Sequence, residues 1–379
     1  MANITTDSFS IVILVLKRVG LYYEINQSKL VKIWSFLLYF SSVSVSVLVA
    51  TNLFNDKTMD TMQFNQMVLF LAGSVPGNLK LVPFFVKPKK MKACIEFFDN
   101  EFFIPKNKEE KRITKKCIRV CQRNVKIYAV VIIFAVICWM TLPFFETEPR
   151  LPLNVWLPYD VTSGSATFYA TYFYLVAVCF YFGLVCEMME PLIGDLAYQA
   201  TSQLKILKYN LRHLSDHSVG SFESVPKTLI RCVVHHNKIL NFLVEYEDCF
   251  SWCVFCQIAG TTFALCFCCV GVGLSLVSSF SMNFVMYVIS YCVNAFQLLF
   301  YCHYGSLLYD ENNELMSAIY MGPWYNYDVR VRKFLLIIME RSKIPLVLTA
   351  GKVINLTYAT FTSVLKTSYS LIAVLNRHN

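Results

Sequence analysis

Long stretches without a charged residue alternate along this chain with segments rich in lysine and arginine. A helix needs about 20 apolar residues to cross the roughly 30 Å hydrocarbon core of a bilayer. Runs of this order occur at Ile33 to Asn55, Thr61 to Leu79, Ile127 to Phe145 and Val161 to Cys186. The 61 residues from Cys249 to Tyr309 also lack Asp, Glu, Lys and Arg, and a polar stretch from Ser278 to Asn283 divides them into two further spans. The run from Val353 to Leu375 is the seventh, so the pattern predicts an all-α fold with seven transmembrane helices.

Amphipathic periodicity predicts further helices between the spans. Leucines recur every three or four residues at Leu204, Leu207, Leu211 and Leu214, and a less strict repeat runs through Ile230, Val233, Val234, Leu240 and Leu243. We expect these helices to extend the fourth and fifth spans and to pack together. A third helix is predicted from Arg330 to Arg341, with one side formed by Phe334, Leu335, Ile338 and Met339. The eight apolar residues from Phe9 to Leu16 are too few to span a bilayer and predict a cytosolic or interfacial helix.

The distribution of positive charge predicts the direction of threading. Thirty of the 34 lysines and arginines fall in residues 1–32, 80–126, 187–248 and 310–352, whereas the alternate loops carry only Lys57 and Arg150. Cytosolic loops are the basic ones in membrane proteins. We therefore expect a cytosolic N-terminal segment (1–32), six spans with long cytosolic loops (33–309, with loops at 80–126 and 187–248), a cytosolic loop and anchor helix (310–352), and a last span with an extracellular tail (353–379).

The overall composition excludes several functional classes. The chain is 56% hydrophobic and 16% charged, which is unlike a soluble domain. Its net charge of +9 does not indicate nucleic-acid binding, because that needs a basic face on a soluble domain. Most of the 15 cysteines lie in apolar runs and are expected to be free thiols. Cys253 and Cys256 have a C-x-x-C spacing, but they lie in an apolar span away from His235 and His236, so we expect neither a metal nor a cofactor, and no enzyme activity.

Aromatic and other apolar residues concentrate in the outer halves of several expected spans. Together they could line an apolar cavity with a few hydroxyl groups, the usual character of a small-molecule pocket. For any single residue, contact with lipid or an interfacial belt is at least as good an interpretation. The candidate set is Phe64, Met67, Phe70, Leu71, Ile137, Trp139, Met140, Phe168, Tyr169, Tyr172, Phe173, Tyr287 and Tyr291.

Several motifs near the C-terminus resemble those of a known family. They are YCHYGS from Tyr301, AIYMGPWY from Ala318, RKFLLIIMERS from Arg332, LVLTAGK from Leu346 and TFTSVLKTSYS from Thr360. These look like the C-terminal signature of insect odorant receptors, and LPLNVWLPYD from Leu151 resembles that family's second extracellular loop. The chain lacks the Gln-Phe of the related gustatory receptor motif. It also has V-L-K at Val364 where the co-receptor subunit reads V-L-G, and it lacks that subunit's very long second cytosolic loop, so it resembles a tuning subunit.

The resemblance implies an odorant-gated, non-selective cation channel in the plasma membrane of a sensory dendrite. The family's channel is a heterotetramer that contains the co-receptor, surrounded by membrane lipid. A small volatile binds between the second, third, fourth and sixth spans, and the aromatic lining favours indole-like or phenol-like ligands. The last span would line the pore, with a constriction at Leu371, Val374 and His378. Cytosolic helices would anchor the subunits through Trp324, Tyr325, Phe334, Leu335, Ile338 and Met339.

Lys366 near the middle of the last span needs its own explanation. A cation at that depth costs roughly 2.5 to 3.5 kcal/mol on insertion scales. At about 100° per residue, Lys366 lies about 140° from Leu371 and about 80° from Val374 around the helix. One hypothesis places Lys366 at the flank of a wet pore, solvated by hydroxyls, carbonyls and water. The alternative is that it snorkels towards the interface and has no role in conduction.

Two other classes of function remain as alternatives. A seven-helix chemoreceptor that signals through a G protein would need an external N-terminus, together with a D-R-Y-like motif after the third span and N-P-x-x-Y in the seventh. Neither motif is present. A secondary transporter would be expected to have internal repeats and broken spans, and we see no such repeat.

Overall fold

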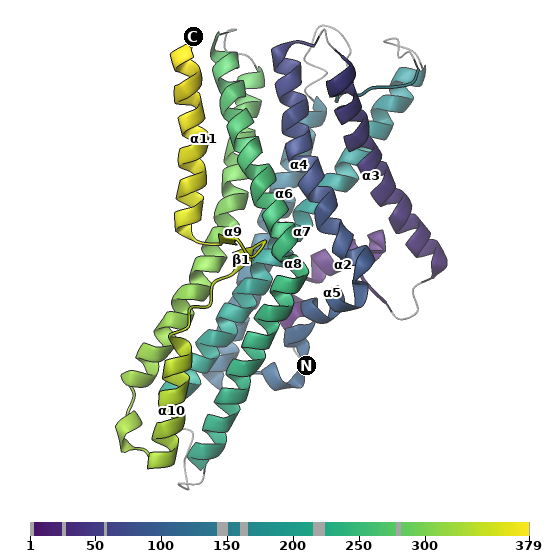
Figure 1. Cartoon of the computed structure of the whole chain (residues 1–379). Helices are drawn as coiled ribbons and strands as arrows, with labels where there is room; N and C mark the ends of the chain where they lie inside the picture. Colours follow the sequence, from purple (N-terminus) through teal and green to yellow (C-terminus); the bar gives the residue numbers. More distant parts are fainter. Residues whose placement is uncertain are drawn as a thin grey trace.

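The protein is a bundle of long helices with one short hairpin (Figure 1). The computed structural model describes residues 4–24, 28–56, 59–141, 151–159, 166–214, 224–277 and 282–378, without the side chains of 136, 138–141, 224–225, 276–277, 282 and 371–378. The helices are α1 (Ile4–Ser8), α2 (Ser10–Val19), α3 (Lys29–Asn55), α4 (Thr61–Val86), α5 (Pro88–Ile95), η1 (Phe97–Asp99), η2 (Glu101–Phe103), α6 (Lys108–Thr141), α7 (Ala166–Arg212), α8 (Ser224–Val277), α9 (Met282–Tyr320), η4 (Trp324–Asn326), α10 (Val329–Ser342) and α11 (Tyr358–His378). The strands are β1 (Thr349–Ala350) and β2 (Ile354–Asn355), so the all-α prediction is confirmed but for this hairpin.

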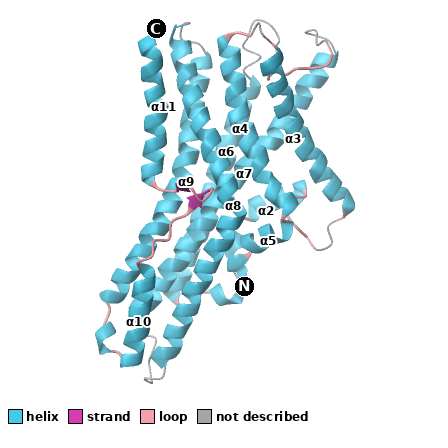
Figure 2. Ribbon diagram, viewed as in Figure 1, coloured by secondary structure: helices cyan, strands magenta, loops and turns pink. Residues whose placement is uncertain are grey.

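Several helices are longer than a bilayer is thick. At a rise of 1.5 Å per residue, the 47 residues of α7 extend about 70 Å. Among the described residues, α3, α4, α7, α8 and α9 are long and apolar enough to cross a membrane. Helix α11 and the C-terminal part of α6 lie in the upper half of the view in Figure 2, and the described side chains of α6 and α11 end at Ile137 and Ser370, short of a complete apolar span.

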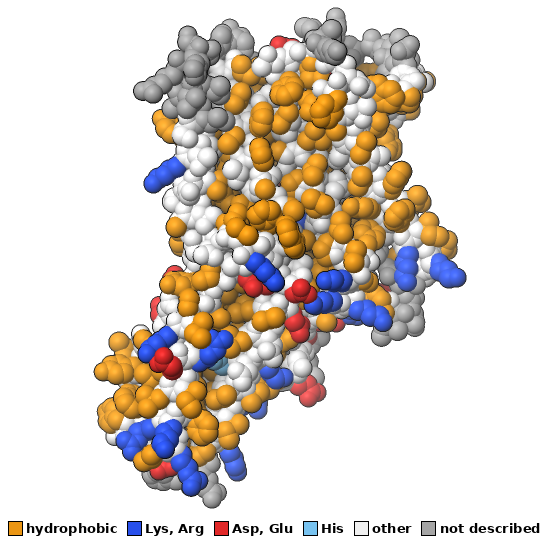
Figure 3. Space-filling model, viewed as in Figure 1, with side chains coloured by type: hydrophobic (Ala, Val, Ile, Leu, Met, Phe, Trp, Pro, Cys, Tyr) orange, Lys and Arg blue, Asp and Glu red, His pale blue; other side chains and the backbone are white. Residues whose placement is uncertain are grey.

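Charged side chains are concentrated in one half of the molecule. In Figure 3 the half that contains α3, α4 and α11 is covered largely by hydrophobic side chains, whereas Lys, Arg, Asp and Glu gather at the waist and below. The lower half is built from the extended ends of α7, α8 and α9 together with α10 (Figure 1). The expected extension of the fourth and fifth spans is therefore confirmed, since α7 and α8 each continue without a break from the apolar half into the charged half.

Helical periodicity predicted one buried stripe correctly and another less well. Leu204, Leu207, Leu211 and Leu214 are all buried, as expected for α7. On α8 the prediction was displaced around the helix: the side chains of Ile230 and Val234 are 60% and 40% exposed. The buried positions there are Leu229, Cys232, His235, His236, Ile239, Phe242 and Leu243, of which only Leu243 belonged to the predicted repeat. The packed face of α8 therefore includes Cys232 and His236, which lie between the predicted positions.

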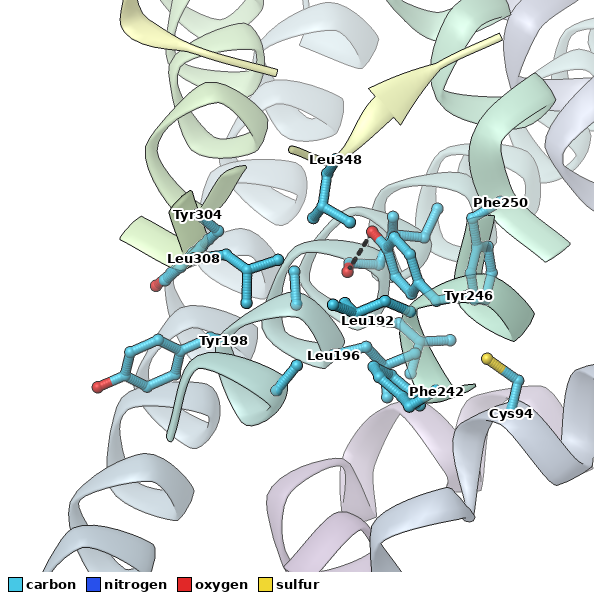
Figure 4. Close-up of a cluster of buried hydrophobic side chains, with 14 of the residues drawn as sticks. Cys94, Leu192, Leu196, Tyr198, Phe242, Tyr246, Phe250, Tyr304, Leu308 and Leu348 are labelled. Atoms are coloured by element: carbon cyan, nitrogen blue, oxygen red, sulfur yellow. Dashed lines mark hydrogen bonds between the residues drawn. The ribbon is translucent and has the colours of Figure 1, made fainter. Parts of the chain in front are cut away.

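The charged half has an aromatic core. Figure 4 shows Phe242, Tyr246 and Phe250 of α8 beside Leu192 and Leu196 of α7, with Leu308 of α9 and Leu348 nearby. The hydroxyl of Tyr246 donates to the carbonyl of Ile193 at 3.0 Å, so its polar end is satisfied inside this core. The N-terminal helix joins the same cluster, because Phe9, Val12 and Leu16 are buried in it. The predicted helix at Phe9 to Leu16 therefore exists and packs against the bundle.

The hairpin before α11 has no counterpart in the sequence-based expectations. Thr349 pairs with Asn355 and Ala350 with Ile354 in an antiparallel register. Gly351 and Lys352 have φ angles of 62° and 59°. A left-handed backbone favours glycine, and at Gly351 an added Cβ would also lie 2.8 Å from the ring of Phe255. The hairpin places the start of α11 against the middle of the bundle (Figure 1).

Candidate ligand and pore sites

The first candidate site lies in the apolar half, between α3, α4, α7 and the segment 151–159. Here Met67 of α4 is 2% exposed and packs with Val45 and Val49 of α3 and with Leu175 and Val178 of α7. Phe70 and Leu71 lie against the same cluster, as do Leu153 and Val155. The amide of Trp156 donates to the carbonyl of Leu48 at 3.3 Å, which holds this segment on α3. Three of the candidate pocket residues, Met67, Phe70 and Leu71, therefore belong to one apolar cluster.

Tyr287 occupies a second position, where α9 meets α4 and α8. It is 3% exposed, and its hydroxyl donates to the sulfur of Met62 at 3.5 Å. An added Cβ on Gly271 of α8 would lie 2.6 Å from the Tyr287 ring, so only a residue without a side chain fits there. Beside it, the side-chain amide of Asn65 donates to the carbonyl of Phe267 at 3.2 Å. The hydroxyl of Tyr287 and the side-chain amide of Asn65 therefore lie among apolar side chains, a composition that many small-molecule sites share.

The other candidate pocket residues are dispersed. Phe168 is buried, and its ring lies 6.3 Å from that of Tyr172. Tyr291 packs against the large core of the bundle. In the single chain, exposure is 44% for Phe64, 55% for Ile137, 55% for Tyr169 and 68% for Phe173. The side chains of Trp139 and Met140 lie outside the described residues.

The side chain of Lys366 is exposed on α11. That helix packs on α8 and α9 through Phe361, Val364, Leu365 and the fully buried Ser368. The opposite face is rich in hydroxyls, which satisfy themselves within the helix: Thr367 donates to the carbonyl of Ser363 at 3.0 Å. Thr362, Tyr369 and Ser370 share the exposed face with Lys366. The side chains of Leu371, Val374 and His378 lie outside the described residues, although their backbone belongs to α11.

Polar contacts that the sequence did not suggest connect α11 to the rest of the bundle. The carboxylate of Glu247 in α8 accepts hydrogen bonds from the amide and the hydroxyl of Thr349 in β1. Ser251 of α8 donates to the carbonyl of Thr349 at 2.9 Å and accepts from the amide of Gly351 through its own carbonyl, also at 2.9 Å. At the start of α11, the amide of Tyr358 donates to the hydroxyl of Ser306 in α9 at 3.1 Å. A movement of α8 or α9 would therefore act on α11.

A buried ion pair lies where the apolar half meets the charged half. Lys80 of α4 pairs with Glu190 of α7, and their side chains are 2% and 0% exposed. The sequence-based prediction placed Lys80 in the expected loop 80–126 and Glu190 in the expected loop 187–248, both in the cytosol, and so it missed this pair. The reason is that α4 continues as helix to Val86 and α7 to Arg212, which packs both charges inside the bundle.

The candidate anchor residues are partly buried and partly exposed in the single chain. Leu335 and Ile338 are buried, together with Val331 and Ser342. Phe334 and Tyr325 are 53% and 64% exposed, whereas Trp324 and Met339 pack against the core. Large exposed apolar side chains also include Tyr320, Met321, Val329, Leu336 and Ile337. An apolar patch of this kind usually marks an interaction surface.

The two histidines considered for metal binding have other surroundings. A ring nitrogen of His235 lies 3.0 Å from the amide oxygen of Gln203. Burial lowers the pKa of both His235 and His236 to about 4, so each is neutral near pH 7. Within the described part of the chain, no cluster of three or more His, Cys, Asp or Glu side chains is placed to hold a metal.

The chain is similar to known proteins both in sequence and in fold. The profile of the family described as 7tm Odorant receptor matches residues 60–369. Odorant receptor 85c of Drosophila melanogaster is 24% identical over 374 residues, which cover 92% of this chain and 93% of that protein. Putative odorant receptor 85d of the same species is 25% identical over 248 residues, 64% of this chain and 58% of that protein's length. The fold is similar to that of olfactory receptor OR5 from Machilis hrabei, solved in complex with eugenol, with a TM-score of 0.86, 15% identity and 98% coverage of both chains.

A family match over most of the chain and a shared fold over nearly all of it agree with each other. They also confirm the resemblance that was inferred from the C-terminal motifs. This is a family of receptors rather than of enzymes. The chain is a membrane protein that belongs to the 7tm odorant receptor family.

Proposed function

We propose that the chain is the ligand-tuning subunit of an odorant-gated, non-selective cation channel in the plasma membrane of a sensory dendrite. It would assemble with a co-receptor subunit into a tetramer, with its N-terminus in the cytosol and its C-terminus outside. The observation that carries this proposal is the attachment of α11 and of the hairpin before it. Glu247 and Ser251 of α8 hold the hairpin and Ser306 of α9 holds the start of α11, which links these long helices to the helix proposed to line the pore.

The proposed odorant position is the apolar half, where Met67 and Phe70 lie between α3, α4 and α7 and where Tyr287 packs on Gly271. A small ligand that binds one packing of these helices better than another shifts the equilibrium by the difference in affinity. The aromatic lining favours a phenol-like or indole-like volatile. Support comes from the fold match to a receptor solved in complex with eugenol, which is a substituted phenol.

Assembly is supported by the exposed apolar residues around η4 and α10. Tyr325, Phe334 and Ile337 present ring and aliphatic surface on the single chain, in a half of the molecule that is otherwise charged. Burying such side chains between subunits is favourable by about 1.5 to 3 kcal/mol each when fully covered. In the proposed tetramer, α11 of each subunit faces a shared axis, with Leu371, Val374 and His378 at its narrow part and Lys366 at its flank.

The test is co-expression in a cell line that lacks odorant receptors. Cells that contain this chain and a co-receptor should respond to members of a panel of small aromatic volatiles, and cells that contain this chain alone should not. An epitope tag on the C-terminus should stain intact cells. A tag that stains only permeabilised cells would contradict the proposed threading, and a response that survives without the co-receptor would contradict the proposed assembly.

A further inference from the structure

The outward face of α6 changes from basic to apolar within one helical turn. Exposed residues recur every three or four positions along this face. Its middle part carries Lys116, Arg119, Arg123 and Lys126, and the exposed residues that follow are Ile127, Val130, Phe134 and Ile137. The side chains of Ile127 and Val130 are 41% and 67% exposed in the single chain. The change at Lys126 and Ile127 is what a helix shows where it enters the hydrocarbon region.

A groove of about 750 Å³ follows this face. Its lining includes all four basic residues at one end and Ile127, Val130 and Val131 at the other. A second hollow of about 220 Å³ adjoins it and shares Gln122 and Lys126. The second hollow also includes Ser8, at the end of α1, and Ser10, at the start of α2, together with Ile11 and Val125. The combined surface is therefore positive and polar at one end and apolar at the other.

The positive charges of the groove form no ion pair among the described residues, although Arg123 interacts at longer range with the buried Asp195. Among the described residues, no Asp or Glu oxygen lies within 4.0 Å of Lys116, Arg119, Arg123 or Lys126. Elsewhere the exposed cations are often paired, as Lys208 is with Glu311 at 2.6 Å. Gln122, which lines the groove, contacts α1: its side-chain amide donates a hydrogen bond to the backbone carbonyl of Asp7 at 2.8 Å. Four cations without an ion pair in the described part of the chain favour an anionic ligand in this groove.

We propose that this groove binds an anionic phospholipid. The phosphate-containing headgroup lies against Arg119, Arg123 and Lys126, and an acyl chain follows Ile127, Val130 and the apolar residues beyond them. A soluble anion would use the basic end alone, whereas the continuous apolar surface needs a ligand with a hydrocarbon tail. Basic pockets beside transmembrane helices recognise anionic headgroups in this way. The proposal depends on α6 entering the bilayer at Ile127, and it depends on the proposed threading only for the choice of the cytosolic leaflet.

The experiment measures lipid binding to the purified full-length chain in a neutral detergent, by fluorescence anisotropy of short-chain labelled lipids. Phosphatidylserine should bind at least about 30-fold more tightly than phosphatidylcholine, since each surface cation contributes about 5-fold to the affinity for an anionic lipid. In the variant Arg119→Gln/Lys126→Gln, binding of phosphatidylserine should weaken about 30-fold. The matched control, Lys111→Gln/Lys227→Gln, removes the same charge from exposed positions outside the groove and should bind as the unmodified chain does.

Three results would overturn the proposal. Equal affinity of the unmodified chain for the two lipids would show that the headgroup charge is not recognised, and this comparison needs no variant. Equal weakening in the two double variants would show that only the net charge of the protein matters. Full competition by glycerophosphoserine, which has the headgroup without the chains, would assign the groove to a soluble anion. None of these readouts requires odorant gating, so failure here leaves the channel proposal to be judged separately.

Discussion

Glu247 in the middle of α8 holds Thr349 of β1 by two hydrogen bonds to the same carboxylate oxygen. The backbone amide of Thr349 donates at 3.0 Å and its hydroxyl at 2.8 Å. Thr349 lies nine residues before the start of α11 at Tyr358. A hydrogen bond to a charged group contributes about 1.5 to 3 kcal/mol, more than a neutral one. Glu247 therefore holds the hairpin that precedes the proposed pore helix against α8.

Replacing Glu247 tests this connection. Glu247→Ala leaves a partly buried amide and hydroxyl of Thr349 without their acceptor, so the variant should lose about 1 to 3 kcal/mol of stability. Thermal unfolding of the purified protein, followed by intrinsic fluorescence, measures the loss. Glu245→Ala, which removes the same charge two residues earlier, is the control. Equal melting temperatures for the two variants would show that the contact with Thr349 is unimportant.

The buried pair of Lys80 and Glu190 predicts strong coupling between two substitutions. Lys80→Met leaves the buried Glu190 carboxylate uncompensated and should cost about 3 to 5 kcal/mol. Glu190→Leu should cost less, because Glu187 also interacts with Lys80. The double variant replaces both charges with apolar groups and should recover most of that loss. Melting temperatures of the four proteins form a double-mutant cycle. A double variant as unstable as the sum of the single variants would argue against a direct pair.

Gly271 tests the proposed ligand position near Tyr287. Gly271→Ala would place a methyl group 2.6 Å from the Tyr287 ring, so the ring must move. We expect the odorant concentration for half-maximal response to change at least about 10-fold, the effect of about 1.4 kcal/mol. Gly273→Ala is a close control, because an added Cβ there meets no atom within 4 Å. Unchanged sensitivity in both variants would place the ligand elsewhere.

His235 and His236 predict a loss of stability in acid. Both lie in α8 before the charge-free run that begins at Cys249, and burial lowers their pKa to about 4 from an ordinary value near 6.5. The unfolded chain therefore binds protons at a pH where the folded chain does not. Stability should be complete above about pH 6.5 and should fall as the pH drops towards 4, by about 2 kcal/mol for His235 between pH 7 and pH 5. His235→Gln should flatten the dependence of melting temperature on pH, and an unchanged slope would contradict this origin.

Lys366 is predicted to influence conduction if it lies at the flank of the pore. Lys366→Met removes a positive charge beside the ion path and should increase the amplitude of the odorant-evoked cation current. Lys32→Met, which removes an exposed lysine of α3, should leave the current unchanged. Reversal potential, amplitude and ligand sensitivity are measured together. If none of the three differs in the Lys366 variant, the lysine snorkels and has no role in conduction.

Local periodicity explains why much of the fold could be predicted. The spacing of Leu204, Leu207, Leu211 and Leu214 defines a helix and its buried face without any knowledge of its neighbours. The charge-free runs likewise define the apolar parts of α3, α4, α7, α8 and α9, since a bilayer of fixed thickness sets their length. The C-terminal motifs supplied the family.

Contacts between distant residues could not be predicted in the same way. Lys80 and Glu190 are 110 positions apart, and Thr349 and Glu247 are 102 apart. Each side chain alone is typical of a solvated loop, and only packing makes it a partner. Gly271 gave no sequence signal either, since its role depends on how closely Tyr287 approaches. The candidate pocket residues were chosen by residue type and expected depth, which do not define how the helices face one another; Tyr169 and Phe173 are exposed in the single chain, and their part in a pocket stays a prediction.

Recording from excised membrane patches tests the central claim most directly. Patches taken from cells that contain this chain and a co-receptor are bathed in solution free of nucleotides, and an activating volatile is applied. The proposal predicts unitary openings that follow the volatile at once, with a cation current that reverses near zero in symmetrical salt. Openings that need added nucleotide or G protein, or patches that stay silent while whole cells respond, would contradict it.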